Sequence, residues 1–510
     1  MEDRPASSAR AWLPPLMGAL AALILLFALL PHGIGVTSDC VDYFSTAGNL
    51  AENNGFLQHD GRPYASWPPL YPMLLVLGSW MNAGPETTAL VLNMLSLFLM
   101  LWLALRWALL NLRNRLLAHW LGLAFLLHFA FWDVALHAWT EPLYNFMAML
   151  FLLLLPRASR KDSWAALAGL ALLAASAWLL RYVGLTLVTV GGIFFLFSGS
   201  MSWPRRIARA AVFGLIAAVP AVLWMIRNIR VMGEWAGERS PSSFGFLQNL
   251  SRLGKAAWWI VPESWGKVLP GMVLMILIAG ILFLAFRGRG KPRRHLELRR
   301  ALLLYSALYL ALLLYSSTRY AFEAIHSRYL MPVLPPLLLW LSLWLDDRFT
   351  GLKAPAKNAL IILLTLWLVF PAAVSTKMIE RAREEGVDVF GAPEWTGWPL
   401  WDWLAGSPPE AILISNGADA VHYHTGLPVR LAPRRWIHST SLAPTDELQD
   451  FATIFEEGRP VFYVWIADFP RTGARENYHS LEEVLERYRL EPIVAFPEGA
   501  VFMVLPRVTN

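Results

Sequence analysis

Long apolar runs recur along most of the chain, and few charged residues interrupt them. A helix that crosses a bilayer needs roughly 20 consecutive, mostly apolar residues. Several runs approach this length, so we predict a polytopic membrane protein with about eleven transmembrane helices. The eleven runs are residues 12–30, 86–105, 116–138, 141–155, 164–180, 183–198, 207–226, 268–286, 301–317, 329–345 and 358–375.

The first polar connection, residues 31–85, is long and rich in aromatic side chains. Residues 39–53 have helical spacing, with Tyr43, Ala47 and Leu50 on one stripe. Residues 70–81 are apolar but too short to span a bilayer. We therefore expect a helix at the membrane interface, with Trp67, Tyr71 and Trp80 as interface residues.

The composition changes after residue 375, where charged residues, Pro and Gly become frequent. Residues 411–415, 460–466 and 500–505 have the pattern of buried strands, and residues 480–488 that of a helix. His422 and His424 alternate as on a strand face. The expected fold class is mainly α: a transmembrane domain, residues 1–376, followed by a small extracytoplasmic α/β domain, residues 377–510.

Basic residues are concentrated in every second connection between the apolar runs. Five short basic segments lie at residues 106–115, 157–161, 205–209, 287–300 and 353–357. Basic loops mark the cytoplasmic side of a membrane. This predicts a protein of the plasma (inner) membrane with a cytoplasmic N-terminus and an outer C-terminal domain. The positive charge is explained by membrane lipids and topology, and nucleic acid is not an expected partner.

Two carboxylates follow the first run by about ten residues, which places them near the outer membrane surface. They are Asp39 and Asp42. A carboxylate there can accept a proton from a hydroxyl or bind a divalent cation. The alternative for Asp39 is an N-cap, because Asp is preferred where a helix begins. Cys40 is the only cysteine, so no intrachain disulfide can form.

Arginines lie at the predicted outer ends of several runs, notably Arg181, Arg227, Arg319 and Arg328. Arginine at membrane depth is energetically unfavourable unless it meets an anion or a water-filled cavity. Its planar fork suits phosphate. Snorkelling to lipid headgroups is the alternative for any single arginine. Several on one side favour an anionic ligand.

Other polar groups occur on the same side. Glu141 opens the fourth run in Thr140-Glu141-Pro142, a pattern that also suits a plain helix start. The pairs Asp133/His137 and Glu323/His326 have spacings that permit a metal, although two residues are weak evidence. The polar, Gly-rich residues 233–243, with Arg239, form a loop that suits a headgroup or sugar. No cofactor is evident from motifs, and a divalent metal ion is left open.

Several short motifs, taken in order, resemble one family. Asp39, Tyr43 and Gly55 precede Trp67-Pro68-Pro69-Leu70-Tyr71-Pro72, and Thr140-Glu141-Pro142-Leu143 follows. Next come Arg181-Tyr182-Val183-Gly184, residues 224–243 and Arg328-Tyr329-Leu330-Met331-Pro332. This set resembles the GT-C type polytopic glycosyltransferases, in the branch with protein O-mannosyltransferases, aminoarabinose transferases and bacterial galacturonosyl- and mannosyltransferases.

The resemblance implies that a sugar moves from a polyprenyl-phosphate donor to a glycan, lipid or protein acceptor outside the cytoplasm, with inversion. Asp39 then corresponds to the catalytic carboxylate, as base or metal ligand, and Asp42 is the nearest second acid. Many relatives carry an acidic residue directly after this Asp, where this chain has Cys40. Trp67-Pro68 likewise departs from a Lys-Pro of the aminoarabinose subgroup. The residues assigned to substrate binding are Arg181, Arg227, Arg239, Arg328, Glu141 and Tyr71.

Two other functions remain open from the sequence. A transporter or flippase of a lipid-linked sugar needs the same arginines but no base, and transporters often contain inverted repeats. A non-catalytic scaffold needs neither the arginines nor the carboxylates to converge. The site residues, rather than the fold, must decide between these functions.

Overall fold

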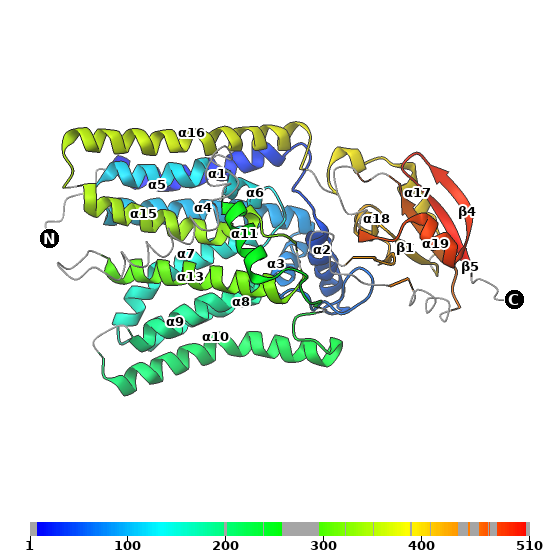
Figure 1. Ribbon diagram of the computed structural model, residues 1–510, viewed down its shortest axis with the longest axis horizontal. Helices are drawn as coiled ribbons and strands as arrows, with labels where there is room; N and C mark the ends of the chain where they lie inside the picture. The colour runs from blue at the N-terminus through cyan, green and yellow to red at the C-terminus, as the bar shows by residue number, and fades with distance from the viewer. Residues whose placement is uncertain are drawn as a thin grey trace.

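The computed structural model describes residues 8–197, 201–237, 239–257, 295–321, 323–349, 351–387, 390–408, 410–436, 447–448, 458–467, 469 and 477–505. The chain is a helical bundle joined to a small domain with one β-sheet (Figure 1). The expected multi-pass, mainly α architecture is confirmed.

Seven helices of the described chain are long and apolar enough to cross a membrane, and the bent pair α5–α6 would make an eighth. Helices α8 and α9 are shorter apolar helices of the same bundle. The predicted run 268–286 lies outside the described residues, so the number eleven stays a prediction. The bundle consists of α1 (Ser8–Leu29), α4 (Pro85–Asn111), α5 (Arg115–Leu127), α6 (Phe129–Ala135), α7 (Glu141–Arg160), α8 (Trp164–Leu180), η1 (Tyr182–Gly184), α9 (Leu185–Phe197), α10 (Trp203–Met232), α11 (Phe246–Ala257), α13 (Leu296–Arg319), α14 (Ser327–Leu330), η4 (Met331–Val333), α15 (Leu334–Phe349) and α16 (Ala354–Glu384).

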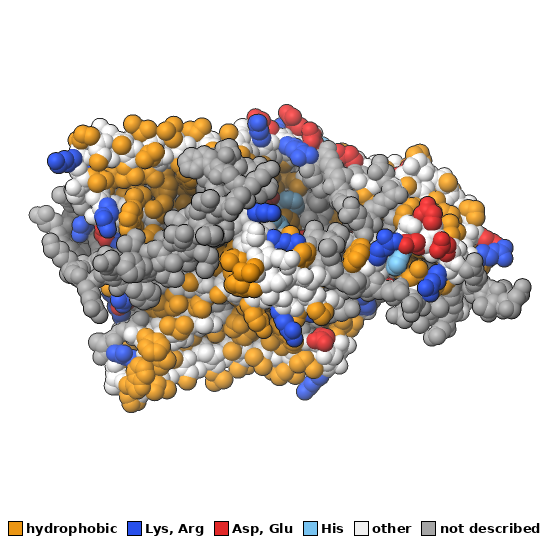
Figure 2. Space-filling view, viewed as in Figure 1, with side chains coloured by type: hydrophobic (Ala, Val, Ile, Leu, Met, Phe, Trp, Pro, Cys, Tyr) orange, Lys and Arg blue, Asp and Glu red, His pale blue; other side chains and the backbone are white. Residues whose placement is uncertain are grey.

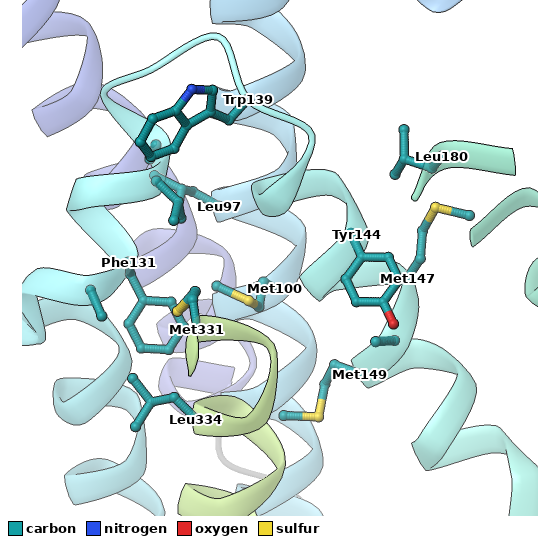
Figure 3. Close-up of a cluster of buried hydrophobic side chains, with 14 of the residues drawn as sticks. Leu97, Met100, Phe131, Trp139, Tyr144, Met147, Met149, Leu180, Met331 and Leu334 are labelled. Atoms are coloured by element: carbon teal, nitrogen blue, oxygen red, sulfur yellow. The ribbon is translucent and has the colours of Figure 1, made fainter. Parts of the chain in front are cut away.

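One continuous apolar core holds these helices together. Lipid tails are as apolar as leucine, so close van der Waals packing rather than water exclusion favours helix association in a bilayer. Hydrophobic side chains also cover the outside of the bundle, whereas charged ones gather at its ends and on the C-terminal domain (Figure 2). Figure 3 shows the core side chains Leu97, Met100, Phe131, Tyr144, Met147, Leu180, Met331 and Leu334.

The described parts of the basic loops lie at one end of the bundle, as their alternation along the chain predicts (Figure 1). The carboxylate of Asp346 in α15 accepts hydrogen bonds from the backbone nitrogens of Arg113 and Asn114, at 3.0 and 2.8 Å. Arg160 at the end of α7 pairs with Glu297 at the start of α13, at 2.6 Å. The first contact ties the end of α15 to the turn between α4 and α5, and the second ties the end of α7 to the start of α13.

The opposite end of the bundle carries the first polar connection. It contains α2 (Ser38–Ala51) and α3 (Leu70–Ser79), close to the predicted helices. Trp80 is 79% exposed, as an interface residue should be, and Trp67 is half-buried. Tyr71 is only 1% exposed, so its prediction as an interface residue is wrong. Its ring packs edge-on against Tyr43 with centroids 5.1 Å apart, which joins α3 to α2.

The C-terminal domain is built on a five-stranded sheet of order β2-β1-β3-β5-β4. Strands β1, β2 and β3 are parallel, while β5 pairs antiparallel with both β3 and β4. A capping box between Ser480 and Glu483 begins α19, which explains its sharp start. Its elements are η5 (Pro393–Trp395), α17 (Pro399–Ala405), β1 (Ile412–Ser415), α18 (Ala418–Thr425), β2 (Val429–Leu431), β3 (Val461–Ile466), α19 (Leu481–Arg487), β4 (Arg489–Phe496) and β5 (Gly499–Leu505).

His422 and His424 lie in α18, so their prediction as strand-face residues is wrong. The helix ends at Gly426, whose positive φ of 71° makes it the left-handed C-cap. His424 stacks on Trp401 with ring centroids 5.0 Å apart, and its Nε2 lies 2.9 Å from the Phe390 carbonyl oxygen. These contacts anchor α18 to α17 and to the segment before η5. Helix α18 also packs beside α2, between the sheet and the helical bundle (Figure 1).

Candidate active site

A polar cavity of about 300 Å³ opens at the end of the bundle that carries α2. Three arginines and two carboxylates line this first cavity, together with tyrosines and the Trp67-Pro68 segment. The ionisable lining residues are Asp39, Arg181, Arg239, Glu323 and Arg328. Segments that are distant in sequence therefore converge on one space.

Arg328 links a carboxylate that lines the cavity to one that lies behind its wall. Its Nη2 donates to Asp39 Oδ2 at 2.9 Å, and its Nε donates to Glu141 Oε1 at 2.5 Å. Its guanidinium carbon lies 3.8 Å from the centroid of the Trp139 ring, a close cation–π contact. Two nitrogens of Arg328 are thus committed to carboxylates, which fixes the plane of the guanidinium.

Glu141 lies directly behind the cavity wall and is completely buried. Arg181 Nη1 donates to Glu141 Oε1 and to Thr140 Oγ1, both at 2.7 Å. A buried carboxylate is stable only when paired and hydrogen-bonded. Glu141 therefore holds Arg181 and Arg328 side by side. Without this carboxylate, the two positive charges would repel each other.

Asp39 lies in the first turn of α2, and the N-cap of this helix is Thr37. The capping alternative for Asp39 is therefore wrong. Its side chain is 30% exposed toward the cavity, so a substrate can reach it. Burial raises the pKa of Asp39, and the Arg328 charge opposes that rise. Such a carboxylate is better suited to accept a proton than an ordinary surface aspartate.

The two neighbours of Asp39 on α2 have different roles. Tyr43 is one helical turn on, lines the cavity and is held by Tyr71. Cys40 faces the other way, with its Sγ 3.4 Å from the Ala138 carbonyl oxygen. Burial raises the pKa of Cys40 to about 12, so the thiol stays protonated. The position after Asp39 is thus a structural contact here.

The Gly-rich loop closes one side of the cavity. Gly237 has a positive φ of 71°, and a Cβ there would lie 2.7 Å from Ser66 Oγ. Arg239 Nη2 donates to the Ser66 carbonyl oxygen at 3.0 Å. The backbone nitrogen of Ala321 donates to the Ser240 carbonyl at 2.8 Å. The loop therefore joins the first polar connection to the segment before Arg328.

Four predicted site residues do not line the first cavity, and one of them is Glu141 behind its wall. Arg227 instead donates to the Tyr64 and Phe56 carbonyl oxygens, at 2.6 and 3.2 Å, and packs on Trp224. Tyr71 is buried behind Tyr43, and Asp42 points to a different flank of α2. These positions support the site from outside its wall.

The overall arrangement resembles several solved structures. ArnT from Cupriavidus metallidurans superposes with a TM-score of 0.57 at 15% identity, over 98% of each chain. Arabinofuranosyltransferase AftD from mycobacteria gives 0.55 at 16% identity, over 99% of this chain and 40% of its own. The oligosaccharyltransferase of Archaeoglobus fulgidus gives 0.51 at 13% identity, over 96% and 72%. The chain has the GT-C fold.

No protein-family model and no curated protein sequence matches the chain. The GT-C fold is therefore established by three-dimensional similarity alone, at identities where sequence alignment is weak. Within this fold the cavity lies at the end of the bundle, where the long first connection and the Gly-rich loop cover it.

The two candidate metal pairs of this GT-C chain form other contacts. His137 Nδ1 lies 2.8 Å from the Asp133 backbone oxygen, and its ring stacks on Trp139 at 4.0 Å. His326 Nε2 and Glu323 Oε2 lie 3.4 Å apart, and both side chains are exposed. In the part of the chain that is described, no three His, Cys, Asp or Glu side chains are grouped to hold a metal.

Sequence reasoning missed several residues of the cavity. Tyr182 and Tyr329 line it, and each directly follows a predicted arginine. Trp139, which packs under Arg328, was also missed. The adjacent Trp139-Thr140-Glu141 segment was the available signal, because an aromatic ring next to a buried acid favours an arginine between them.

Proposed function

We propose that this protein is a membrane glycosyltransferase that transfers a sugar from a polyprenyl-phosphate donor to a hydroxyl of an acceptor. The GT-C fold supports membership of this enzyme class. A second structure of ArnT from Cupriavidus metallidurans, bound to undecaprenyl phosphate, superposes with a TM-score of 0.57 at 15% identity, over 97% of this chain and 98% of its own. That relative supports a donor of the same lipid-phosphate chemistry here.

One observation carries the proposal: Asp39 and Arg328 share a cavity and touch each other, although 289 positions separate them. Glycosyl transfer from a phosphate donor needs a base for the acceptor hydroxyl and cations for the departing phosphate. A transporter needs only the cations. The accessible carboxylate beside the arginines therefore favours an enzyme.

The chemistry follows from this pairing. A donor phosphate that enters the cavity competes with Asp39 for Arg328, because both are anions that match the guanidinium fork. Asp39, released from this contact, removes the proton of the acceptor hydroxyl. The hydroxyl oxygen attacks the anomeric carbon, the carbon–phosphate oxygen bond breaks, and polyprenyl phosphate leaves. Arg181, Arg239 and Arg328 stabilise the charge that develops on the leaving group.

Water would compete with the acceptor in this reaction, so the site must exclude it. Trp67, Pro68 and the Gly-rich loop cover the first cavity, and Arg239 fixes this cover through Ser66. We assign these segments to closing the site over the bound sugar.

The reaction side is proposed to be extracytoplasmic, in the plasma (inner) membrane. The first cavity lies at the bundle end opposite the basic loops, and basic loops stay in the cytoplasm. A reporter that works only in the cytoplasm, fused after Asn510, should be silent, and one fused near residue 112 should be active. An active C-terminal fusion would contradict this orientation.

Reconstitution tests the activity directly. The purified chain, in liposomes with radiolabelled sugars on undecaprenyl phosphate, should release undecaprenyl phosphate and label an acceptor extract from cell envelopes. Movement of intact donor across the bilayer, without cleavage, would instead establish the transporter alternative. No cleavage with any donor sugar, by a folded protein that binds the lipid phosphate, would refute the glycosyltransferase.

A further inference from the structure

A second cavity, of about 580 Å³, lies between the first polar connection and the C-terminal domain. Helix α2 separates it from the first cavity. Asp39 and Tyr43, one turn apart, face the first cavity. Phe44, Gly48 and Glu52, also spaced by four, face the second. One helix therefore forms a wall of both spaces.

The lining of the second cavity is acidic. Its acidic side chains are Glu52, Asp60 and Glu86, and no Arg or Lys is among the lining residues in the described chain. Asp60 pairs with Arg62 next to it, so Glu52 and Glu86 are the acids that a ligand can reach. The amides of Asn49 and Gln58 and the rings of Phe44 and Tyr423 complete much of the wall. An anionic ligand would be repelled here. Carboxylates and amides accept and donate hydrogen bonds, as sugar hydroxyls require.

A buried histidine in the wall is independent evidence that the second cavity binds a ligand. His59 lines the second cavity with its side chain only 5% exposed, and its Nε2 lies 3.2 Å from Asp419 Oδ1. Its Nδ1 has no hydrogen-bond partner within the described chain. The atom itself is buried at the edge of the cavity. Buried polar atoms are nearly always paired, so a ligand oxygen that reaches this nitrogen would satisfy it.

We propose that the second cavity binds a neutral or amine-bearing sugar unit of an oligosaccharide acceptor. This unit is remote from the acceptor hydroxyl that reacts at Asp39. The proposal rests on the proposed glycosyl transfer. A helix with its side chains is about 10 Å across. An acceptor that reaches both sides of α2 must therefore be extended, which suits an oligosaccharide better than a single sugar. Aromatic rings beside hydroxyl-binding groups favour a sugar over a basic peptide.

Three trisaccharides of different charge test the proposal on the full chain in lipid nanodiscs: maltotriose, the glucosamine trimer and trigalacturonic acid. Saturation-transfer NMR should detect the neutral and cationic sugars, and the anionic one should not bind. The double substitution Glu52→Gln and Glu86→Gln should weaken binding about tenfold, the scale of lost charged hydrogen bonds. Both positions are exposed, so folding should be preserved. Glu410→Gln, exposed in the C-terminal domain, is the control.

The proposal is overturned if none of the three sugars binds, if trigalacturonic acid binds best, or if the double variant binds as tightly as the parent chain. Tighter binding of a Lys-Ser peptide than of either sugar would also overturn it. Undecaprenyl phosphate binding and donor cleavage are measured alongside. The absence of both in the parent chain would refute the proposed function. Sugar binding that depends on Glu52 and Glu86 would still support a sugar site in the second cavity.

Discussion

The two cavities on either side of α2 differ in charge and in how they are built. The first collects arginines from distant helix ends and balances them against Asp39 and the buried Glu141. The second lies between a loop and the C-terminal domain and carries three acids, with no Arg or Lys among its lining residues in the described chain. The contrast supports the proposed phosphate chemistry in the first cavity and the proposed hydroxyl recognition in the second.

Asp39 and Asp42 show the same contrast within one helical turn. Asp39 is paired with Arg328 in the first cavity. Asp42 is half-buried, and its pKa is raised well above its ordinary value by burial and by the charge of Asp419. The two acids are therefore expected to respond very differently to the same substitution.

The largest expected effect is that of Asp39→Asn. Removing a general base typically reduces the rate about 10²–10⁴-fold. We expect transfer to fall at least about a hundredfold on that scale, with the protein still folded in the membrane and still able to bind undecaprenyl phosphate. Asp42→Asn should have a milder effect. Near-normal transfer by purified Asp39→Asn would contradict the assignment and direct attention to Asp42, Asp133 and Glu141.

Arg328 is expected to have the next largest effect. Arg328→Ala leaves Asp39 without its partner and Glu141 with Arg181 alone, and breaking a buried ion pair costs about 3–5 kcal/mol. Both stability and donor binding should fall. Arg328→Lys should restore part of the stability but less of the donor binding, because Lys lacks the planar fork. Equal recovery of both would show that the charge alone matters. Thermal unfolding and lipid-phosphate titration separate the two effects.

Arg239 and Arg227 form a matched pair. Both hold backbone carbonyls of the first polar connection, but only Arg239 lines the first cavity. Arg239→Ala should weaken undecaprenyl phosphate binding about tenfold, the scale of a charged hydrogen bond. Arg227→Ala should leave that affinity nearly unchanged and lower the stability by about 1–3 kcal/mol. Equal loss of affinity in the two variants would remove the distinction between lining and supporting arginines.

The smallest expected effect concerns the second cavity and pH. Burial opposes the protonation of His59, but its hydrogen bond and charge interaction with Asp419, aided by Asp42 and Asp60, raise its pKa above the ordinary 6.5. The pKa of Asp419 is lowered, because the bonds from His59 and Ser38 outweigh burial. The neighbouring His422 has a lowered pKa, chiefly through burial.

These pKa shifts determine how the stability of the region changes with pH. A histidine with a raised folded-state pKa contributes stability that is complete below pH 6.5 and disappears as the pH rises through the raised value. The lowered pKa of Asp419 matters only in acid. We expect hydrogen exchange at residues 56–64 and in α18 to report an opening free energy that falls by about 1–2 kcal/mol above that pKa. His59→Gln should abolish this dependence. An unchanged dependence in the variant would assign it to another group.

Local sequence patterns determined much of the fold. Apolar runs predicted the bundle, and alternating basic loops predicted which helix ends meet. The helices α2, α3 and α19 and the strands β1, β3 and β5 lie close to their predicted positions. Strand β2 was missed because it has only three residues, and β4 because its exposed residues include Glu491 and Pro492. Each success rests on a periodicity that one segment carries by itself.

Only the tertiary structure decided which residues form the site. The sequence nominated Arg181, Arg227, Arg239 and Arg328 alike, and packing placed three of them at the first cavity and Arg227 outside it. Packing likewise paired Asp39 with Arg328 and turned Asp42 toward the C-terminal domain. A local pattern fixes the length and the buried face of a helix. It contains no information about which distant helix end supplies the partner of a buried charge, and that partner determines the chemistry.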